Sequence, residues 1–423
     1  MAATAVTPGT RVGRLSVPGI SARVAAAGII ALAVFLLPLF LEEFQNNQIT
    51  RAPVYAIIGL SMNVLMGHLG QISLGHQAFV GLGAFVSGFV ATELGLSFYL
   101  AMPIAGLFGA FSAFLLGLVA LRLRGLYLAL ITLAYGAVAE ESLFNIRALT
   151  RGGEGMPAPR PAEFQSDRAY LYLSLIVLIL VLVIDWRLVK SKAGRAILAI
   201  RHDERVAATM GVNVTFYKTL AFMISGFLAG MAGSLFAHWQ QTVVSNDFVL
   251  DVALTWVFMT VVGGLGSRAG VVIGASFFAL FPFIMEALPL IPDTWHDDVP
   301  RWVPLIGAGL LLTTLILYPG GIGQQLLPVR RWLAGGPFRE HKKDRKRKKQ
   351  KAVEPTAPVP QELVHPPAEE LPTEEAPAPA ADRATVQDGP PAEPPPEAAA
   401  GDGQPLGTPK RGLLRRGFRR KGA

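Results

Sequence analysis

The chain has 423 residues, of which 52% are hydrophobic and only 16% are charged, and its mean hydropathy is +0.43. This balance predicts an integral membrane protein, because soluble proteins carry more charge and less apolar surface. Cysteine is absent, which excludes disulfides, zinc–thiolate sites and thiol nucleophiles. The net charge of +8 is concentrated in particular loops and in the C-terminal tail, so it is a topology signal, and no nucleic-acid partner is expected.

The chain begins with a segment that carries few structural signals. Residues 1–23 contain three arginines, and we expect them to form a cytoplasmic N-terminal segment. The uncharged run Val24–Leu41 follows and is long enough for one membrane span. No Ala-x-Ala-like cleavage site follows this run, so a retained anchor is favoured over the alternative, a secretory signal.

Nine further apolar segments predict membrane spans, and with the first they make about ten spans in an all-α polytopic bundle. Residues 24–335 form the predicted transmembrane domain. Small-residue pairs inside the spans, such as Gly226 with Gly230 and Gly270 with Gly274, predict close helix packing. The nine segments are 53–67, 77–92, 97–120, 125–139, 169–185, 219–239, 252–266, 269–288 and 302–319.

A polar, glycine-rich stretch at residues 67–79 interrupts the first half of the bundle. Non-helical backbone at membrane depth survives only when it is buried in protein or lines a wet cavity. One interpretation is that its polar side chains border a translocation path; the other is a surface turn whose polar groups satisfy one another. A second interruption is expected near Gly263–Gly270, and Leu65–Gly70 weakly resembles Val262–Gly266, as a repeat would. The predicted path residues are Asn63, Gln71, Ser73, His76 and Gln77.

Sites for chemistry are sparse. His68 and His76 have no carboxylate near them in sequence, so no metal site is predicted. No P-loop, G-x-S-x-G elbow or His-Glu-x-x-His occurs, so we predict no catalytic residue, no cofactor and no enzyme activity. A proton relay is a further alternative, since ionisable groups inside membranes are usually functional, but the predicted span edges place the candidates at the interface. These candidates are Glu140, Glu141, Asp185 and Glu286.

A charged loop at residues 186–218 separates two apolar spans. From Ala193 to Met210 helix formers dominate, and Gly211 then supplies a stop, which predicts one short helix outside the membrane. A rigid helix with a small-residue face suits a segment that receives mechanical force from a separate motor protein. The residues expected to share that face are Glu204, Ala207, Ala208 and Gly211.

Lysine and arginine concentrate in alternate loops, and the intervening loops are acidic except for the mixed loop at 145–168. This pattern predicts that both termini and the helix at 193–211 face the cytoplasm. Residues 336–423 contain basic blocks around a tract rich in Pro, Ala and Glu, which predicts a disordered tail. Its basic blocks are expected to contact anionic membrane lipids. The alternative is a topology anchor followed by a solubilising tail.

Four motifs in order resemble those of the permeases of bacterial branched-chain amino acid ABC importers. They are Gly59–Ala84, Leu121–Ala134, Ser191–Lys218 and Met259–Gly270. The Leu-Arg-Leu-Arg-Gly-Leu-Tyr element that begins at Leu121 is similar to the M-type permease subunit rather than the H-type subunit. The resemblance extends from about residue 50 to about residue 285 and does not include the tail.

The resemblance implies a bacterial inner-membrane importer with several subunits. An M-type and an H-type permease would form the pathway, cytoplasmic ABC ATPase subunits would supply energy, and an extracytoplasmic binding protein would deliver a branched-chain amino acid. Related proteins also carry urea or short amides, and an ion-coupled secondary transporter or a non-transporting membrane scaffold are alternatives of other classes. The family's Glu-Ala-Ala…Gly docking loop, from which the spacing here departs, implies an ATPase contact through Arg201, Glu204, Ala207, Ala208, Gly211 and Asn213.

Overall fold

The computed structural model describes residues 35–120, 123, 125–151, 154–286, 299–317 and 320–325. The chain separates into two units, 1–349 and 350–423, and every described residue belongs to the first. The expected N-terminal segment 1–23 and tail 336–423 therefore lie outside the described residues, as does most of the first predicted span.

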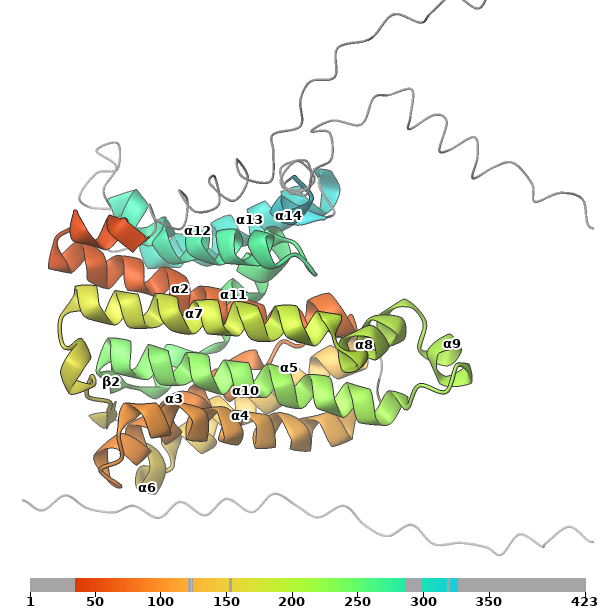
Figure 1. Cartoon of the computed structure of the whole chain (residues 1–423), viewed down its shortest axis with the longest axis horizontal. Coiled ribbons are helices and arrows are strands. Elements are labelled where there is room, and N and C mark those ends of the chain that lie inside the picture. Colours follow the sequence, from red (N-terminus) through yellow and green to blue (C-terminus); the bar gives the residue numbers. More distant parts are fainter. Residues whose placement is uncertain are drawn as a thin grey trace, which may run out of the picture. The chain divides into compact units, whose positions relative to one another are not determined.

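The described part of the chain is a bundle of helices, so the predicted all-α class is confirmed (Figure 1). Two short strands, β1 (Met156–Pro157) and β2 (Thr242–Val243), pair antiparallel. Shorter helices lie between the long ones, namely α6 (Arg147–Thr150), α8 (Lys192–His202) and α9 (Glu204–Thr209), and α14 (Gly321–Gln325) follows the last long helix. The long helices are α2 (Glu43–Asn63), α3 (His76–Thr92), α4 (Phe98–Ala120), α5 (Leu126–Glu141), α7 (Asp167–Lys190), α10 (Val214–Gln240), α11 (Leu250–Gly263), α12 (Arg268–Glu286) and α13 (Val299–Leu317).

The long helices correspond to the nine later predicted spans. Within the described residues, seven helical stretches are long and apolar enough to cross a membrane, and two shorter apolar ones lie at His76–Thr92 and Leu305–Thr314. The predicted count of ten spans is not confirmed. The remaining candidate, the first predicted span at 24–41, falls largely outside the described residues.

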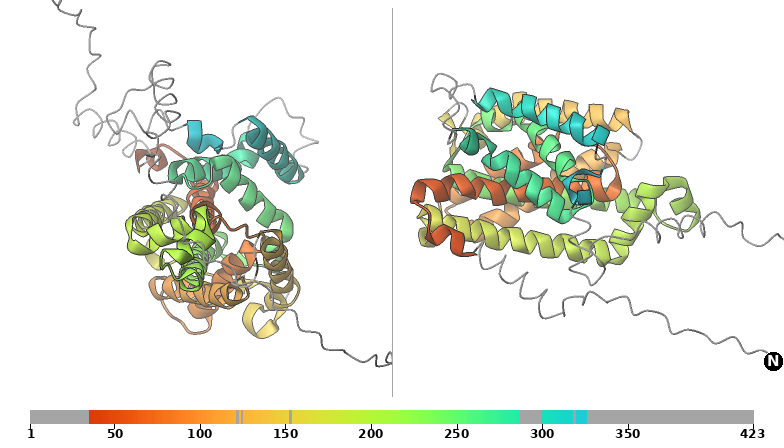
Figure 2. Two further views of the ribbon diagram at one scale, coloured as in Figure 1. Left: turned by 90° about the vertical axis from the view of Figure 1, so that its right-hand side faces the viewer. Right: turned by 90° about the horizontal axis from the view of Figure 1, so that it is seen from above.

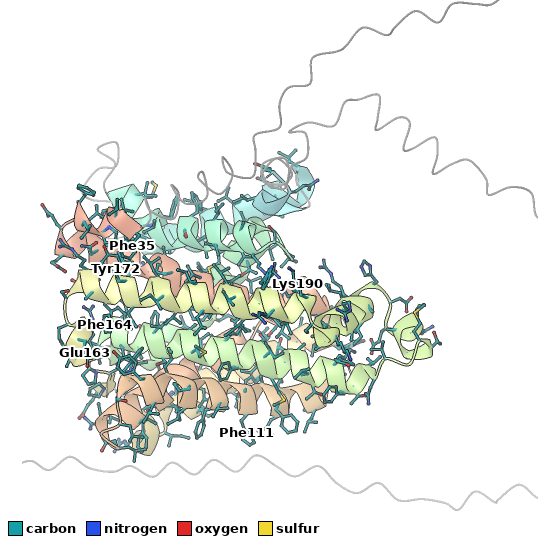
Figure 3. The ribbon with its side chains drawn as sticks, viewed as in Figure 1. Phe35, Phe111, Glu163, Phe164, Tyr172 and Lys190 are labelled. Atoms are coloured by element: carbon teal, nitrogen blue, oxygen red, sulfur yellow. The ribbon has the colours of Figure 1, made fainter. Side chains whose placement is uncertain are left out.

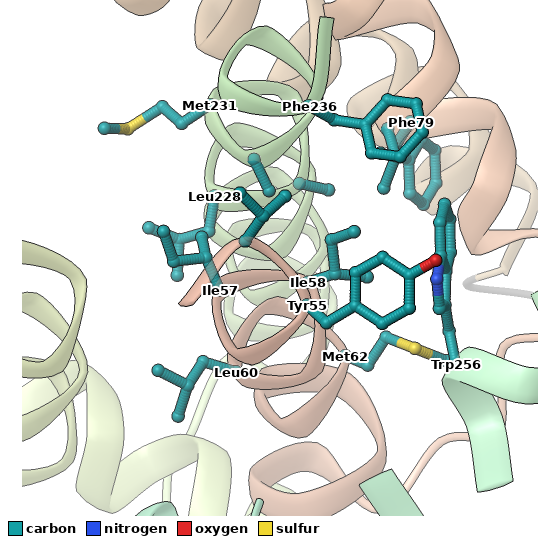
Figure 4. Close-up of a cluster of buried hydrophobic side chains, with 14 of the residues drawn as sticks. Tyr55, Ile57, Ile58, Leu60, Met62, Phe79, Leu228, Met231, Phe236 and Trp256 are labelled. Atoms are coloured by element: carbon teal, nitrogen blue, oxygen red, sulfur yellow. The ribbon is translucent and has the colours of Figure 1, made fainter. Parts of the chain in front are cut away.

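Helix α2 lies at the centre of the bundle. The most apolar stretch of this helix is entirely buried, and the helix packs against α7, α10, α11 and α12. Tyr55 on α2 meets Trp256 on α11 edge to face, with ring centroids 6.2 Å apart (Figure 4). Helix α10 packs closely on α4, because a Cβ on Gly226 would lie 2.4 Å from the Cβ of Ala113. This contact agrees with the close packing predicted from the small residues of α10.

The bundle has two distinct ends. Helix α7 runs from the start of α2 to the pair α8 and α9, which we call the α8–α9 end (Figures 1 and 2). Arg268 lies there beside Asp185, whereas Glu43 lies at the opposite end, where it accepts from the backbone N–H of Arg168. Arg268 and Glu43 therefore lie at opposite ends of the bundle, in line with the charge pattern.

The mixed loop at 145–168 lies at the opposite end, and its arginines are partly neutralised there. Arg151 pairs with Glu93 at the end of α3. Arg160 is buried and donates to Asp167 at 2.7 Å and to the carbonyls of His238 and Trp239. Its guanidinium lies 5.0 Å from the centre of the Tyr170 ring. These contacts explain why this loop does not follow the charge pattern of the others.

The prediction of one continuous helix from 193 to 211 is wrong. The segment forms α8 and α9, which break at Asp203, where the backbone is extended (φ −158°, ψ 118°). The Asp203 carboxylate accepts from the backbone N–H groups of Arg205 and Val206, so it caps α9 and competes with helix continuation. Gly211 lies beyond α9 with φ +81°, so it acts as the predicted helix stop. It does not lie on a common helical face with Glu204, Ala207 and Ala208.

Candidate functional site

The polar stretch predicted in the first half of the bundle is an irregular connection between α2 and α3, which we call the polar turn (residues 63–77). After α2 ends at Asn63, a π-helical turn, η2 (Val64–Leu69), ends at Gly70 with φ +77°. A non-helical stretch then leads to the start of α3 at His76. The predicted non-helical backbone is therefore present, and most of it is buried in protein.

The five predicted path residues share an unusual property. Asn63, Ser73, His76 and Gln77 are at most 1% exposed, and Gln71 is partly buried. Each has at least one buried polar atom without a hydrogen-bond partner within the described residues: Asn63 Nδ2, Gln71 Oε1, Ser73 Oγ, His76 Nδ1, and both Nε2 and Oε1 of Gln77. A buried polar atom without a partner costs about 1–3 kcal/mol. The surface turn with mutually satisfied groups is thus the less suitable of the two interpretations.

The start of α3 packs against α2 and α5. His76 Nε2 lies 2.8 Å from Ser61 Oγ on α2. The Gln77 amide lies against Gly136 on α5, where an added Cβ would be 2.4 Å from Gln77 Nε2. The backbone N–H of Leu74 donates to Thr132 Oγ1 of α5 at 2.9 Å. In these contacts His76 and Gln77 meet uncharged polar groups and backbone.

Asn63, at the other end of the polar turn, contacts the glycine-rich turn between α11 and α12. Its Oδ1 accepts from the backbone N–H of Gly266 at 2.7 Å. A Cβ on Gly67 would lie 2.6 Å from the same nitrogen. The two glycine-rich interruptions predicted from the sequence therefore lie side by side. The close approach requires glycine at position 67.

Arg201 at the C-terminal end of α8 joins these two turns to the charged loop. Its guanidinium donates to the carbonyl of Gly67. Its Cγ would lie 2.9 Å from a Cβ on Gly70, and its Nη1 would lie 3.3 Å from a Cβ on Gly266. A movement of α8 would therefore act directly on the backbone of the polar turn.

The other residues predicted for the ATPase contact divide between buried and exposed positions. Glu204 pairs with the buried Lys218 of α10 at 2.6 Å, and Ala207 is buried. Ala208, Gly211 and Asn213 are exposed, and the Asn213 side chain caps α10 by accepting from Phe216 N. Val206 and Met210 are 49% and 78% exposed. The α9 segment thus presents small and apolar groups to its surroundings.

Asp185, named above as an ionisable candidate, belongs to a buried cluster that the sequence did not predict. Asp185 on α7, with its side chain fully buried, lies 2.9 Å from His68 Nε2 of η2 and accepts from the guanidinium of Arg268 at the start of α12. Arg268 Nη2 also donates to the Asp185 carbonyl at 3.1 Å. The expectation that Asp185 is solvated at the interface is therefore wrong. Its place in an otherwise apolar run was a signal, but its partners are 117 and 83 positions away.

The remaining ionisable candidates do not gather. Glu140 is partly exposed and Glu141 is exposed, while the side chain of Glu286 lies outside the described residues. Among the described residues, no group of three or more His, Cys, Asp or Glu side chains is arranged to hold a metal ion.

The sequence profile of a family described as "Branched-chain amino acid transport system / permease component" matches residues 46–314. This range includes α2, the polar turn, α8, α9 and most of α13. The chain belongs to this permease family. The family comprises transport permeases rather than enzymes, and with its apolar helices the chain is a multi-pass membrane protein.

Individual relatives of this permease carry more specific names. It is 30% identical over 334 residues to the "High-affinity branched-chain amino acid transport system permease protein LivM" of Salmonella typhimurium, which covers 72% of this chain and 75% of the relative. The LivM protein of Escherichia coli matches to the same extent. The "Autoinducer 2 import system permease protein LsrC" of Escherichia coli O157:H7 is 26% identical, over 69% of this chain and 85% of the relative. The resemblance to a LivM-type permease is confirmed.

Proposed function

We propose that this permease is the M-type subunit of an ATP-driven importer of branched-chain amino acids in a bacterial inner membrane. The LivM relatives support the solute class, since their printed names give that substrate. The observation that carries the mechanism is the contact of Arg201 with the backbone of the polar turn. It links an exposed, loop-borne helix to the segment that holds the unpartnered polar groups.

In this proposal α8 and α9 form the coupling segment that an ABC ATPase subunit grips. The exposed side of α9, with Val206, Ala208, Met210 and Gly211, is the docking surface. Movement of α8 passes through Arg201 to the two glycine-rich turns, which can rearrange because glycine tolerates several backbone conformations. The polar turn then opens or closes a path beside His76 and Gln77. The unpartnered amide and imidazole atoms supply hydrogen bonds to the solute or its water.

The proposal also assigns topology and partners. The α8–α9 end carries the basic loops and faces the cytoplasm, with both termini on that side. An H-type permease completes the pathway and an extracytoplasmic binding protein delivers the solute to the opposite end. Residues 24–335 constitute the permease domain, 1–23 a cytoplasmic segment and 336–423 a cytoplasmic tail whose basic blocks contact lipid.

Uptake by the complex in liposomes, with its binding protein, tests the proposal. We expect leucine, isoleucine and valine to accumulate when ATP is present on the α8–α9 side, and not when only a proton or sodium gradient is imposed. Uptake driven by an ion gradient without ATPase subunits would instead identify a secondary transporter. Efficient competition by urea or acetamide, but not by valine, would assign the permease to the relatives that carry urea or short amides.

The coupling role of Arg201 has its own test. Replacing it with alanine (Arg201→Ala) removes a charge-assisted hydrogen bond worth about 1.5–3 kcal/mol, so uptake should fall roughly tenfold. ATP hydrolysis by the complex should persist, because the exposed surface of α9 is unchanged. Arg195→Ala is the matched control, since Arg195 is an exposed arginine of the same helix that donates to the carbonyl of Lys190. Equal losses of hydrolysis and uptake would mean that Arg201 acts in docking instead.

A further inference from the structure

A groove of about 480 Å³ runs between α4, α7 and α10 near the α8–α9 end. Its walls are large apolar side chains, which include Ile184 and Leu188 of α7 and Leu220, Met223 and Phe227 of α10. These wall residues are only partly buried, so the groove is open to the surrounding membrane. Along α7 it extends from residue 184 to residue 191, about 10 Å of helix axis.

The end of the groove is cationic. Arg187 and Ser191 line it, and the exposed Lys190 lies one residue before Ser191 (Figure 3). Trp186 is 43% exposed, with Lys190 Nζ 3.9 Å and Arg187 Cζ 5.9 Å from its ring centre. An exposed tryptophan beside basic residues is typical of the boundary between hydrocarbon and headgroups. The groove therefore begins at that boundary and extends toward the hydrocarbon.

Arg187 and Lys190 at this end have no acidic ion-pair partner among the described residues. Residues 186–202 contain Arg187, Lys190, Lys192, Arg195 and Arg201 but no Asp or Glu. A cationic rim above an apolar trough is complementary to a molecule with an anionic head and a hydrocarbon chain.

The wall chemistry favours a lipid over a second protein helix. Helices associate in membranes through small residues that allow close approach, because lipid tails and Leu side chains are equally apolar. Apart from Ala110 of α4, the apolar wall residues are Leu, Ile, Met and Phe, and small residues of α10 such as Gly226 are already used against α4. A flexible acyl chain can fill the irregular space between such side chains, whereas a helix backbone is held away by them.

We propose that this groove is a binding site for an anionic phospholipid, with an acyl chain along α10 and the headgroup phosphate at Arg187 and Lys190. The neighbouring Ser191 caps α8: its hydroxyl donates to the carbonyl of Leu188 at 2.7 Å, and its Oγ accepts from the backbone N–H of Gly194 at 3.0 Å. The headgroup therefore sits at the joint between α7 and α8. Binding holds this joint in place, independently of which solute the permease carries.

Native mass spectrometry of the full-length chain in detergent tests the site with two lipids of identical acyl chains. The probes are palmitoyl-oleoyl phosphatidylglycerol, which is anionic, and palmitoyl-oleoyl phosphatidylcholine, which has no net charge. We expect preferential retention of phosphatidylglycerol, and a roughly tenfold loss of this retention in Arg187→Gln/Lys190→Gln, at about a few-fold per removed cation. Met223→Trp should reduce retention of both lipids, because it fills the trough without changing charge.

Arg205→Gln is the matched control, since Arg205 is an exposed arginine on α9, away from the groove. Melting temperatures measured without lipid show that each variant is folded, and added phosphatidylglycerol should raise the melting temperature of the unaltered chain more than that of the double variant. Equal retention of the two lipids by the unaltered chain would overturn the proposal. So would unchanged retention by folded Arg187→Gln/Lys190→Gln or Met223→Trp, or displacement of the lipid when a second permease subunit assembles.

Discussion

We expect solute uptake by the assembled transporter to fall roughly 30-fold when Gln77 is replaced by methionine, because two hydrogen bonds of about 1 kcal/mol each would be lost from the proposed path. Methionine has nearly the shape of glutamine without its polar amide. The Gln77 side chain is fully buried and both amide atoms lack partners within the described residues. The same substitution should therefore leave the melting temperature of the permease unchanged or raise it. Uptake is measured in liposomes, and stability by thermal unfolding in detergent.

A fall in uptake without a fall in melting temperature distinguishes a role in transport from a role in folding. Thr255→Val on α11 is the matched control, because Thr255 is also a nearly buried polar residue but its hydroxyl donates to the carbonyl of Asp251 in its own helix. We expect normal uptake from that variant. A lower melting temperature for Gln77→Met with normal uptake would show that ordered water satisfies the amide and that Gln77 has a structural role alone.

Replacing Asp185 with asparagine lowers the free energy of unfolding by about 3–5 kcal/mol, the cost of breaking an ion pair whose carboxylate is fully buried. His68 is 5% exposed and loses its carboxylate partner, while Arg268 loses its ion pair and keeps its hydrogen bond to the backbone carbonyl of residue 185. The three residues join η2, α7 and α12, so the loss should loosen the α8–α9 end of the bundle. Thermal unfolding of the purified permease and its yield from membranes measure the effect.

Glu93→Gln provides the comparison for a charged pair that is not buried. Glu93 and Arg151 have side chains that are 42% and 45% exposed, so their pair should contribute at most about 1 kcal/mol. A combined replacement of His68, Asp185 and Arg268 with leucine should recover much of the stability, since it leaves no buried charge. Equal destabilisation by Asp185→Asn and Glu93→Gln would contradict the buried arrangement of Asp185.

The polar turn and the coupling segment differ in how well the sequence anticipated them. Glycine and polar residues between apolar runs act on the backbone within a few positions, so the irregular stretch followed from local composition. The burial of Asn63, Ser73, His76 and Gln77 did not, because the sequence left a surface turn open as an alternative. The break at Asp203 also has a local cause, a carboxylate that caps the next turn. Helix formers on both sides of Asp203 outweighed that signal in the prediction.

The amino-acid sequence by itself determined the class of protein, the positions of the long apolar helices and the residues that interrupt them. Hydropathy, helix propensity and glycine content are properties of neighbouring residues, and each apolar helix is stabilised in a membrane by its own length and composition. The pairing of Asp185 with His68 and Arg268, the contact of Arg201 with Gly67, and the groove beside Arg187 were decided only by the tertiary structure. Each joins groups from different helices, and whether they meet depends on how the whole bundle packs, which no local pattern records.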